Sequence, residues 1–411
     1  MEENRRNVII VGAGFGGIAT ALALSCSNRR DVRITLITDK PHFEYHSGLY
    51  RVVTGKSPLE VCVPLAEIFG ATNVSVVIDA IRAVLPEQNA IRGVGGATYR
   101  YDHLVLALGS QTAYFNIQGL EQFSFGFKSI NEALRLKRHL HELFAQCARP
   151  DVTADERVAM LHFAVVGAGA SGVELAGELA AYTALLAREH AVAQDLVTID
   201  LIEGAPRILP AFSERFSARV AARLRELGVN IYVNRTMLQG RISEIALRGM
   251  TMKTETVIWT AGIKPNELYQ RIPGFSFDQK GRVVVDEFLR AHGTENVFVI
   301  GDGAATPFTG MAQTAIDNGR AAAENIIRAL IAAPLARYVP KKPYYALPVG
   351  QKWAAAIAGS LIIFGRLGWF IRRAADLRYF LSILPLRKAL IAFTSGKKLC
   401  ESCPVCEPAH T

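Results

Sequence analysis

Two short glycine-rich segments have residue types and a spacing that suit the binding of a dinucleotide. The first occupies residues 12–17 (GAGFGG) and the second residues 167–172 (GAGASG). In such a fingerprint the first glycine permits a tight turn, the second lets the backbone approach a pyrophosphate, and the third lets the helix pack closely on the strand. Two bound dinucleotides that face each other predict hydride transfer between them.

The first fingerprint stands in the context that a dinucleotide site requires. An apolar run at residues 8–11 predicts a buried strand, and a helix of small residues follows at 18–24. A pyrophosphate would lie at the N-terminus of that helix, where free N–H groups and the helix dipole favour negative charge. A second strand at 32–37 should end near a ribose-binding carboxylate; Asp39 is the candidate, one residue beyond the usual position at Thr38. A glycine turn that binds nothing is the alternative. The residues predicted for this site are Gly12, Gly14, Gly17 and Asp39.

The second fingerprint has similar surroundings. Residues 163–166 predict a strand, 173–181 a helix and 198–202 the next strand, which Glu203 ends. A carboxylate at that position hydrogen-bonds the adenosine ribose hydroxyls and repels a 2′-phosphate. Because no arginine follows Glu203 before Arg207, the site favours NAD(H) over NADP(H). The residues predicted for this site are Gly167, Gly169, Gly172 and Glu203.

The length and charge of the chain limit the classes of protein that it can form. With 411 residues and a hydrophobic fraction of 50%, the chain can build two or three domains with large cores. The formal net charge is +9, but the basic residues do not form one run and no recognition motif is present, so no nucleic-acid partner is predicted. No charged-then-apolar signal segment precedes the first strand, so export is not expected.

Much of the positive charge lies after residue 340, among apolar residues. The run from Trp353 to Phe370 is apolar, but Arg366 interrupts it and it falls short of the ~20 residues that a membrane span needs. Apolar and basic clusters then alternate, which is typical of helices that lie in a bilayer interface. We therefore predict a membrane surface as a partner. A pair of core helices that covers the first domain is the alternative.

No metal site is predicted. The six cysteines do not form the pattern of a secreted disulfide framework. A group near the C-terminus has metal-like spacing, although a tail with incidental thiols explains it equally well: Cys400, Cys403, Cys406 and His410. His42 and His46, with Glu44 between them, have no cysteine partners close by in the sequence, and a loop that runs near a flavin explains them better.

Two further motifs connect the chain to a known family. Residues 259–265 read W-T-A-G-x-x-P, and a later apolar strand ends in Gly301 and Asp302. With the two fingerprints, this order resembles the superfamily of flavoproteins that bind two dinucleotides. Stretches within residues 114–134 and at 311–315 resemble type II NADH:quinone oxidoreductases, and the resemblance extends from residue 7 to about residue 330.

The resemblance implies non-covalently bound FAD, NADH as the electron donor and a membrane quinone as the acceptor. It also implies peripheral, monotopic attachment to the cytoplasmic face of the cell membrane, without proton pumping, and it is compatible with a homodimer.

The resemblance also assigns residues to the cofactor site and departs from the family pattern at one position. Asp302 would reach the ribityl chain of the flavin, although an aspartate that caps a helix explains the same position. The quinone motif A-Q-x-A-x-Q begins at Ala312, but Asp317 replaces its last glutamine. A protonated carboxyl there can hydrogen-bond a quinone carbonyl; a different acceptor is the other interpretation. The cofactor-binding residues implied in this way are Gly109, Gly262, Gly301, Asp302, Ala312 and Gln313.

Three residues are predicted to be catalytic: Glu174, Gln313 and Asp317. Gln313 should lie beside the flavin on the quinone side, and Asp317 one helical turn further on the same face. Glu174 lies on the helix that follows the second fingerprint, where the family has a glutamate near the nicotinamide. It would deliver protons or orient the nicotinamide. The alternative is a first-turn glutamate that the helix dipole stabilises by up to ~1 kcal/mol.

The predicted fold class is α/β, with two Rossmann-like dinucleotide-binding domains and a C-terminal membrane-associating helical region. An apolar strand near residues 296–301 should return to the first sheet, so that the NADH domain is inserted into the FAD domain. The expected boundaries are 1–120 and 276–340 for the two parts of the FAD-binding domain, 150–275 for the NADH-binding domain, and 345–411 for the C-terminal membrane-associated region, after a linker at 340–348.

Rival functions differ in their cysteine chemistry or their acceptor. A disulfide reductase needs a cysteine pair after the second strand, where only Cys62 is present, and a sulfide:quinone oxidoreductase needs cysteines that flank the flavin, where only Cys147 is close. A soluble NADH reductase of a protein or other small acceptor, and an NADH-sensing flavoprotein, remain open alternatives.

Overall fold

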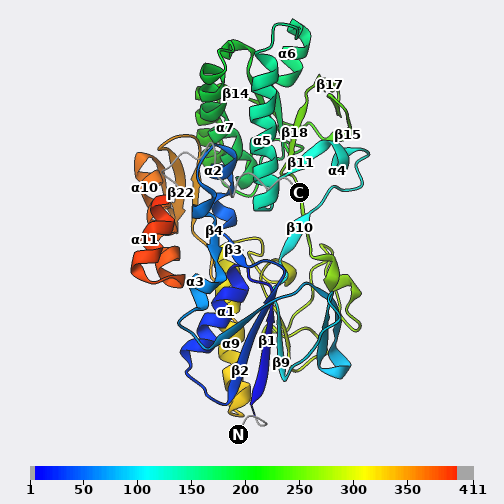
Figure 1. Ribbon diagram of the computed structural model, residues 1–411, viewed down its shortest axis with the longest axis vertical. Helices are drawn as coiled ribbons and strands as arrows, with labels where there is room; N and C mark the ends of the chain where they lie inside the picture. The colour runs from blue at the N-terminus through cyan, green and yellow to red at the C-terminus, as the bar shows by residue number, and fades with distance from the viewer. Residues whose placement is uncertain (1–4, 396–411) are drawn as a thin grey trace.

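The computed structural model describes residues 5–395 and contains two five-stranded parallel sheets (Figure 1). Figure 1 shows them toward opposite ends of the long axis, with β10 between them. The cysteines near the C-terminus lie outside the described residues, and so does His410.

The first sheet has the strand order β20-β9-β1-β2-β5, and every neighbouring pair is parallel. Its strands are β1 (Arg6–Val11), β2 (Val32–Thr38), β5 (Val74–Ile78), β9 (His103–Leu106) and β20 (Val297–Val299). Helices α1 (Phe15–Cys26) and α9 (Ala312–Leu330) pack together beside it. The central strands are apolar without alternation because they are buried on both faces. Strand β20 joins this sheet next to β9, although the whole second sheet lies between them in the sequence.

The second sheet has the order β11-β18-β12-β13-β14, again with parallel pairs. Its strands are β11 (Ser124–Gly126), β12 (His162–Val166), β13 (Thr198–Ile202), β14 (Val229–Tyr232) and β18 (Thr256–Trp259). Its long helices are α5 (Ile130–Cys147), α7 (Ala170–Glu189) and α8 (Glu214–Glu226). Helix α5 begins at a capping box in which Ser129 and Glu132 bond each other's backbone N–H groups.

Short strands and helices connect and cover the two sheets. The antiparallel pair β10 (Ser110–Thr112) and β19 (Ile263–Pro265) lies where the chain passes from one sheet to the other and back. The other short strands are β3 (His42–Glu44), β4 (Cys62–Pro64), β6 (Ile81–Leu85), β7 (Ala90–Gly93), β8 (Thr98–Arg100), β15 (Met237–Arg241), β16 (Glu244–Leu247) and β17 (Met250–Lys253). The short helices are α2 (Leu49–Val53), α3 (Leu65–Phe69), α4 (Leu120–Phe123) and α6 (Ala154–Met160).

The C-terminal segment is not purely helical, so that part of the prediction was wrong. It comprises the antiparallel strands β21 (Tyr345–Pro348), β22 (Ala354–Ala358) and β23 (Leu361–Gly365), followed by α10 (Arg366–Ile383) and α11 (Leu386–Ser395). The predicted linker at 340–348 ends in β21, and the apolar run from Trp353 contains a hairpin. The turn of that hairpin includes Gly359, whose φ of +62° reverses the chain where a helix would continue. Among residues 5–395, no helix is both long and apolar enough to span a membrane.

The C-terminal helices pack against the α2, β3 and β4 side of the first sheet (Figure 1). Phe380 of α10 is fully buried, and its ring centroid lies 5.1 Å from that of Tyr45. Tyr379 stacks on the same tyrosine at 5.5 Å. Lys388 of α11 forms an ion pair with Glu67 of α3. The side of α10 that faces the protein is therefore a core surface, whereas Phe370 on the same helix is 61% exposed.

The packing predicts different outcomes for two phenylalanines of α10. Phe380→Ala should lower the free energy of unfolding by about 3–5 kcal/mol, because it removes a buried ring and leaves a cavity. Phe370→Ala should change it by less than about 0.5 kcal/mol, because that ring is exposed. Thermal unfolding of the two variants beside the wild type measures both. Equal losses would show that α10 does not dock as described.

Candidate functional site

Both glycine fingerprints have the same backbone geometry. The first glycine of each has a positive φ, +103° at Gly12 and +106° at Gly167, which a side chain rarely adopts. A Cβ on the third glycine, Gly17 or Gly172, would collide with the carbonyl oxygen of the first. The third glycine therefore allows the helix to pack directly against the turn.

The second glycine of each fingerprint faces open space. A Cβ placed on Gly14 or Gly169 would meet no atom within 4 Å, so neither glycine is required by contacts within the protein. Both are the N-cap residues of their helices, α1 and α7, with extended backbone. An open backbone position at a helix N-terminus is the arrangement that admits a pyrophosphate.

A cavity of about 1290 Å³ extends from the first fingerprint to residues 170 and 171 of the second. The predicted NADH-site residues Gly167, Gly169, Gly172 and Glu203 are not among its lining residues. The first fingerprint and Asp39, directly after β2, line one part of it. Ala170, Ser171 and Glu174, at the start of α7, line another. Residues of β21, β22 and α10 complete the wall, so the C-terminal segment borders the same space.

Most of the residues predicted for the flavin site line this cavity: Gly12, Gly14, Asp39, Gly109, Gly301, Asp302, Ala312 and Gln313. Asp302 accepts a hydrogen bond of 2.5 Å from the Ser110 hydroxyl, and the Lys128 ammonium lies 3.5 Å from the same carboxylate oxygen. This carboxylate follows β20, and its partners Ser110 and Lys128 come from the chain between β9 and α5. Gly262 does not line the cavity; its Cβ position is filled by the ring of Phe115.

Gln313 and Asp317 do not form the shared face that we predicted. Gln313 lines the cavity, and its amide is paired with the backbone of Tyr344: Nε2 donates to the carbonyl at 3.1 Å and Oε1 accepts from the N–H at 3.0 Å. Asp317 is not among the cavity-lining residues. Burial raises the pKa of the Tyr338 hydroxyl, and the negative charge of Asp317 adds a smaller increase. Asp317, four residues further along α9, therefore does not share the cavity wall with Gln313.

Glu203 directly follows β13, and both of its carboxylate oxygens accept hydrogen bonds from backbone N–H groups. One accepts from the Ala168 N–H at 2.8 Å and the other from the Ala205 N–H at 2.9 Å. Arg207 is turned away, because its guanidinium donates to the carbonyls of Leu209 and Pro210 and to a serine hydroxyl. The site therefore presents a fixed negative charge and no free guanidinium from Arg207, which suits a ribose hydroxyl better than a 2′-phosphate.

Glu174 is the carboxyl on α7 that lines the cavity. Its pKa is raised to about 7, mainly because burial disfavours the charged form. Arg372 and Arg51 oppose this shift, and Asp376 and Glu178 add to it. A carboxyl that titrates near neutral pH can both hold and release a proton under physiological conditions.

The loop that contains the two histidines forms a charged group at the cavity. Glu44 accepts from the Lys40 ammonium at 2.6 Å, and the rings of His42 and His46 lie 3.6 and 3.5 Å from its oxygens. The pKa of His42 is raised to about 9, because its neighbours Cys62 and Glu44 favour the protonated ring, with Cys62 the larger influence. Lys40, His42, Glu44 and His46 all border the cavity and make this part of its wall positively charged on balance.

Sequence reasoning missed the ionisable residues that α10 and α2 contribute. Arg372 and Arg378 line the cavity, and Arg51 lies behind it in a buried cluster with Asp376. The only signal in the sequence was a concentration of basic residues after residue 340, which we interpreted as a lipid surface. Nothing in the local pattern distinguishes an arginine that pairs with α2 from one that faces solvent.

The fold and the cavity define a protein that binds two dinucleotides, and comparison with known proteins agrees. The family model described as pyridine nucleotide-disulphide oxidoreductase matches residues 6–323. The chain is 32% identical, over 415 aligned residues, to the type II NADH:quinone oxidoreductase Ndh of Mycobacterium tuberculosis; the alignment covers 95% of this chain and 88% of the relative. It is 26% identical to the type II NADH:quinone oxidoreductase of Staphylococcus aureus (strain NCTC 8325 / PS 47), with 97% and 100% covered.

Solved structures share the fold. The structure of NDH2 from Plasmodium falciparum in complex with NADH has a TM-score of 0.85 at 18% identity, with 96% of this chain and 98% of that chain covered. The sulfide:quinone oxidoreductase from Aquifex aeolicus has a TM-score of 0.76 at 19% identity, with 97% and 98% covered. The chain belongs to the type II NADH:quinone oxidoreductases, within the pyridine nucleotide-disulphide oxidoreductase family.

The open position at Gly169 predicts a variant that folds but binds nucleotide poorly. Gly169→Ala adds a methyl group that meets no protein atom and suits the extended backbone, so the melting temperature should not change. The methyl group would occupy the approach of the pyrophosphate and weaken NADH binding by about tenfold or more. Gly95→Ala, also in open space but on a distant turn, is the matched control for binding and unfolding. If Gly169→Ala bound NADH with wild-type affinity, the pyrophosphate would not bind at this position.

Proposed function

We propose that this protein oxidises NADH and passes the electrons through FAD to a membrane quinone. The observation that carries the proposal is one cavity that is bordered by the first fingerprint, by Ala170 and Ser171 of the second, and by the C-terminal segment. A donor at the α7 end and an acceptor that enters beside α10 would meet the same cofactor. The names of the relatives agree with this activity.

The residues around the cavity fit FAD. Gly12 and Gly14 offer a tight turn and an open backbone to a pyrophosphate, and Asp39 is at the position of a ribose carboxylate. Asp302, held by Ser110, is the acceptor that we assign to the ribityl hydroxyls. When bound, FAD supplies the chemistry that accepts a hydride and releases electrons, and the protein supplies alignment and charge.

The second fingerprint and Glu203 are the residues that we assign to NADH. The open backbone at Gly169 and the N-terminus of α7 would hold the pyrophosphate, and the Glu203 carboxylate would hold the ribose. The nicotinamide would then extend past Ser171 into the shared cavity. Its alignment over the flavin is a positioning task for the walls of the cavity.

We assign proton delivery to Glu174. Oxidation of NADH and reduction of a quinone to a quinol together consume one proton, because the hydride from NADH brings the other hydrogen, and the cavity wall must supply that proton where solvent is excluded. Glu174 lines the cavity with a pKa near 7 and can donate one and be recharged. Gln313, fixed by Tyr344, would set the shape of the wall beside the acceptor. Asp317 does not line the cavity, so its role at the quinone stays a prediction.

We further propose the division into domains that the sequence predicts and attachment to the cytoplasmic face of the membrane. Strand β20 supports the return of the chain to the FAD part.

Membrane attachment is supported by exposed apolar side chains on the C-terminal helices, which basic residues accompany. These side chains are Leu367, Phe370, Leu381, Leu386, Leu390 and Ile391. The homodimer stays a prediction.

The role of Glu174 predicts a pH dependence of quinone reduction. The rate of flavin reoxidation by a quinone should fall as pH rises through about 7, because Glu174 loses its proton there. Glu174→Gln should remove this dependence and slow the step by about a hundredfold. Stopped-flow absorbance measures the step. Glu189→Gln, on the exposed end of the same helix, is the control and should behave as wild type. A wild-type profile in Glu174→Gln would exclude the assignment.

The exposed apolar side chains predict how the protein binds lipid. The double variant Leu367→Ser and Phe370→Ser should bind anionic vesicles at least about tenfold more weakly, because each loses an apolar group that the bilayer would bury. Val94→Ser, at a 63% exposed valine on a turn far from α10, is the control. Vesicle co-sedimentation measures binding. Equal binding by both variants would place the lipid contact elsewhere.

A further inference from the structure

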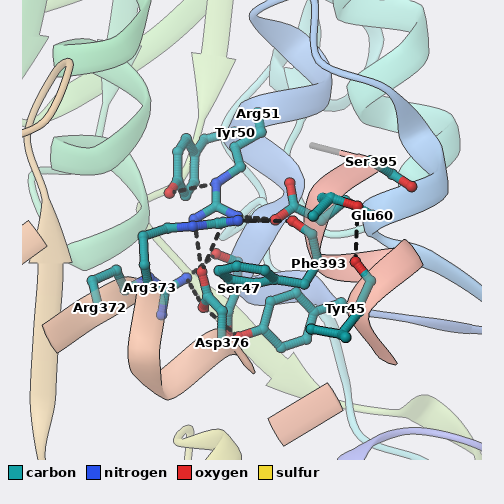
Figure 2. Close-up of polar contacts among 12 residues, drawn as sticks. Tyr45, Ser47, Tyr50, Arg51, Glu60, Arg372, Arg373, Asp376, Phe393 and Ser395 are labelled. Atoms are coloured by element: carbon teal, nitrogen blue, oxygen red, sulfur yellow. Dashed lines mark hydrogen bonds and ion pairs between the residues drawn. The ribbon is translucent and has the colours of Figure 1, made fainter. Parts of the chain in front are cut away.

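A cluster of buried ionisable residues joins α10 to the segment between β2 and β5, and Figure 2 shows it at close range. Its members are Arg51 of α2, Glu60 between α2 and β4, and Arg372, Arg373 and Asp376 of α10. We refer to these five residues as the α10 ion cluster. The carboxylates are almost completely buried, at 1% exposure for Glu60 and 0% for Asp376. The cluster contains one more positive charge than negative charges.

Asp376 is the centre of this cluster. Its carboxylate accepts a hydrogen bond from the Tyr45 hydroxyl at 2.7 Å and from Arg51 Nη2 at 2.8 Å. Arg373 Nη1 lies 3.2 Å from one of its oxygens and Arg372 Nη2 lies 3.4 Å from the other. Four donors therefore meet on one side chain, and they come from the segment after β3, from α2 and from α10 itself. Such a carboxylate stays ionised, and nearby arginines hold its pKa below the usual range against the effect of burial.

Arg372 has an incomplete set of partners. Its Nη2 donates to the Ser47 carbonyl at 2.5 Å, and Asp376 is its ion-pair partner. Its Nε is buried and has no hydrogen-bond partner among the described residues. Arg372 also lines the cavity, so this guanidinium can turn toward another acceptor if its present partners are lost.

Glu174 is the carboxyl that competes for Arg372. The groups that face it are Arg51 and Tyr50 on α2, Arg372 and Asp376 on α10, and Glu178 on its own helix. Arg372 is the largest of the charges that lower its pKa, and Asp376 raises it. In residues 5–395, Glu174 forms no ion pair, and Arg372 is instead paired with Asp376 and with the Ser47 carbonyl. Glu60 is not among the largest influences on the pKa of Glu174.

We propose that Asp376 is a positioning residue for the quinone half-reaction: it holds Arg372 and Arg51 in the α10 ion cluster and so keeps Glu174 free of an ion pair and able to exchange a proton. This inference rests on the proposed role of Glu174. A merely structural Asp376 would stabilise the docking of α10 without affecting the proton at the cavity wall.

The test compares two variants that remove one negative charge each from the same cluster. Asp376→Asn removes the charge that holds Arg372. Glu60→Gln removes a charge that pairs with Arg51 and Arg373 but does not contact Arg372. Flavin reoxidation by a short-chain quinone is measured against pH in both, with Glu174→Gln beside them. The protonated carboxyl band of Glu174 is followed in parallel by infrared difference spectroscopy, identified by its absence in Glu174→Gln, and thermal unfolding reports on the fold.

Asp376→Asn should shift the midpoint of both titrations to lower pH by about one unit, because loss of a negative neighbour and release of Arg372 both favour ionised Glu174. Glu60→Gln should leave both midpoints near the wild-type value, because Asp376 still holds Arg51 and Arg372 in this variant, even if the melting temperature falls as much. An unchanged midpoint in Asp376→Asn, or an equal shift in Glu60→Gln, would overturn the inference. If Glu174→Gln keeps the wild-type rate profile, the proposed role of Glu174 fails instead, and the infrared titration still decides whether Asp376 controls that carboxyl.

Discussion

The constraint on which the structure depends is the delivery of two helix N-termini to one cavity. Phe15 at the start of α1 and Ala170 at the start of α7 both line that space. Each helix end contributes unpaired N–H groups and a partial positive charge equivalent to roughly half an elementary charge. Each approaches its strand closely because the third glycine of its fingerprint has no side chain. The two sheets, each built from buried parallel strands, place these ends so that two anionic cofactors can face each other.

The C-terminal segment completes the cavity and does so at an electrostatic cost. Burying the charges of Arg51, Glu60 and Asp376 removes them from water, and ion pairing offsets that cost only when the geometry is well satisfied. Hydrophobic contacts such as those of Phe380 with Tyr45 supply the attraction between α10 and the segment that follows β3. The buried charges are therefore better explained by what they do at the cavity wall than by their contribution to stability.

Local patterns predicted much of the fold and those candidate-site residues that lie within the fingerprints and directly after the strands. The fingerprints, the strands before them and Glu203 could be found because each depends on residues close together in the sequence. The return of the chain through β20 could be predicted because an apolar strand followed by Gly301 and Asp302 resembles the strand that closes the first domain in the flavoprotein superfamily. The hairpin of β22 and β23 could not, since a run of alanines and isoleucines suits a buried strand and a buried helix alike.

The missed part of the site depends on contacts between distant segments. Asp376 pairs with Arg51 from 325 residues away, and Gln313 pairs with the backbone of Tyr344 across a loop. No periodicity or spacing indicates either contact. The position of Asp317 was misjudged for a related reason: residues four apart share a helix face, but the packing of α9 on α1 decides how far that face reaches into the cavity.

The central claim is that one flavin lies between a nicotinamide site and a quinone entrance. The most direct measurement is rapid-mixing absorbance of the purified protein reconstituted with FAD. NADH should bleach the bound flavin, with NADPH much slower, and a quinone added next should restore the colour within the turnover time. A protein that takes up no flavin, or a flavin that NADH reduces but no quinone reoxidises, would contradict the account.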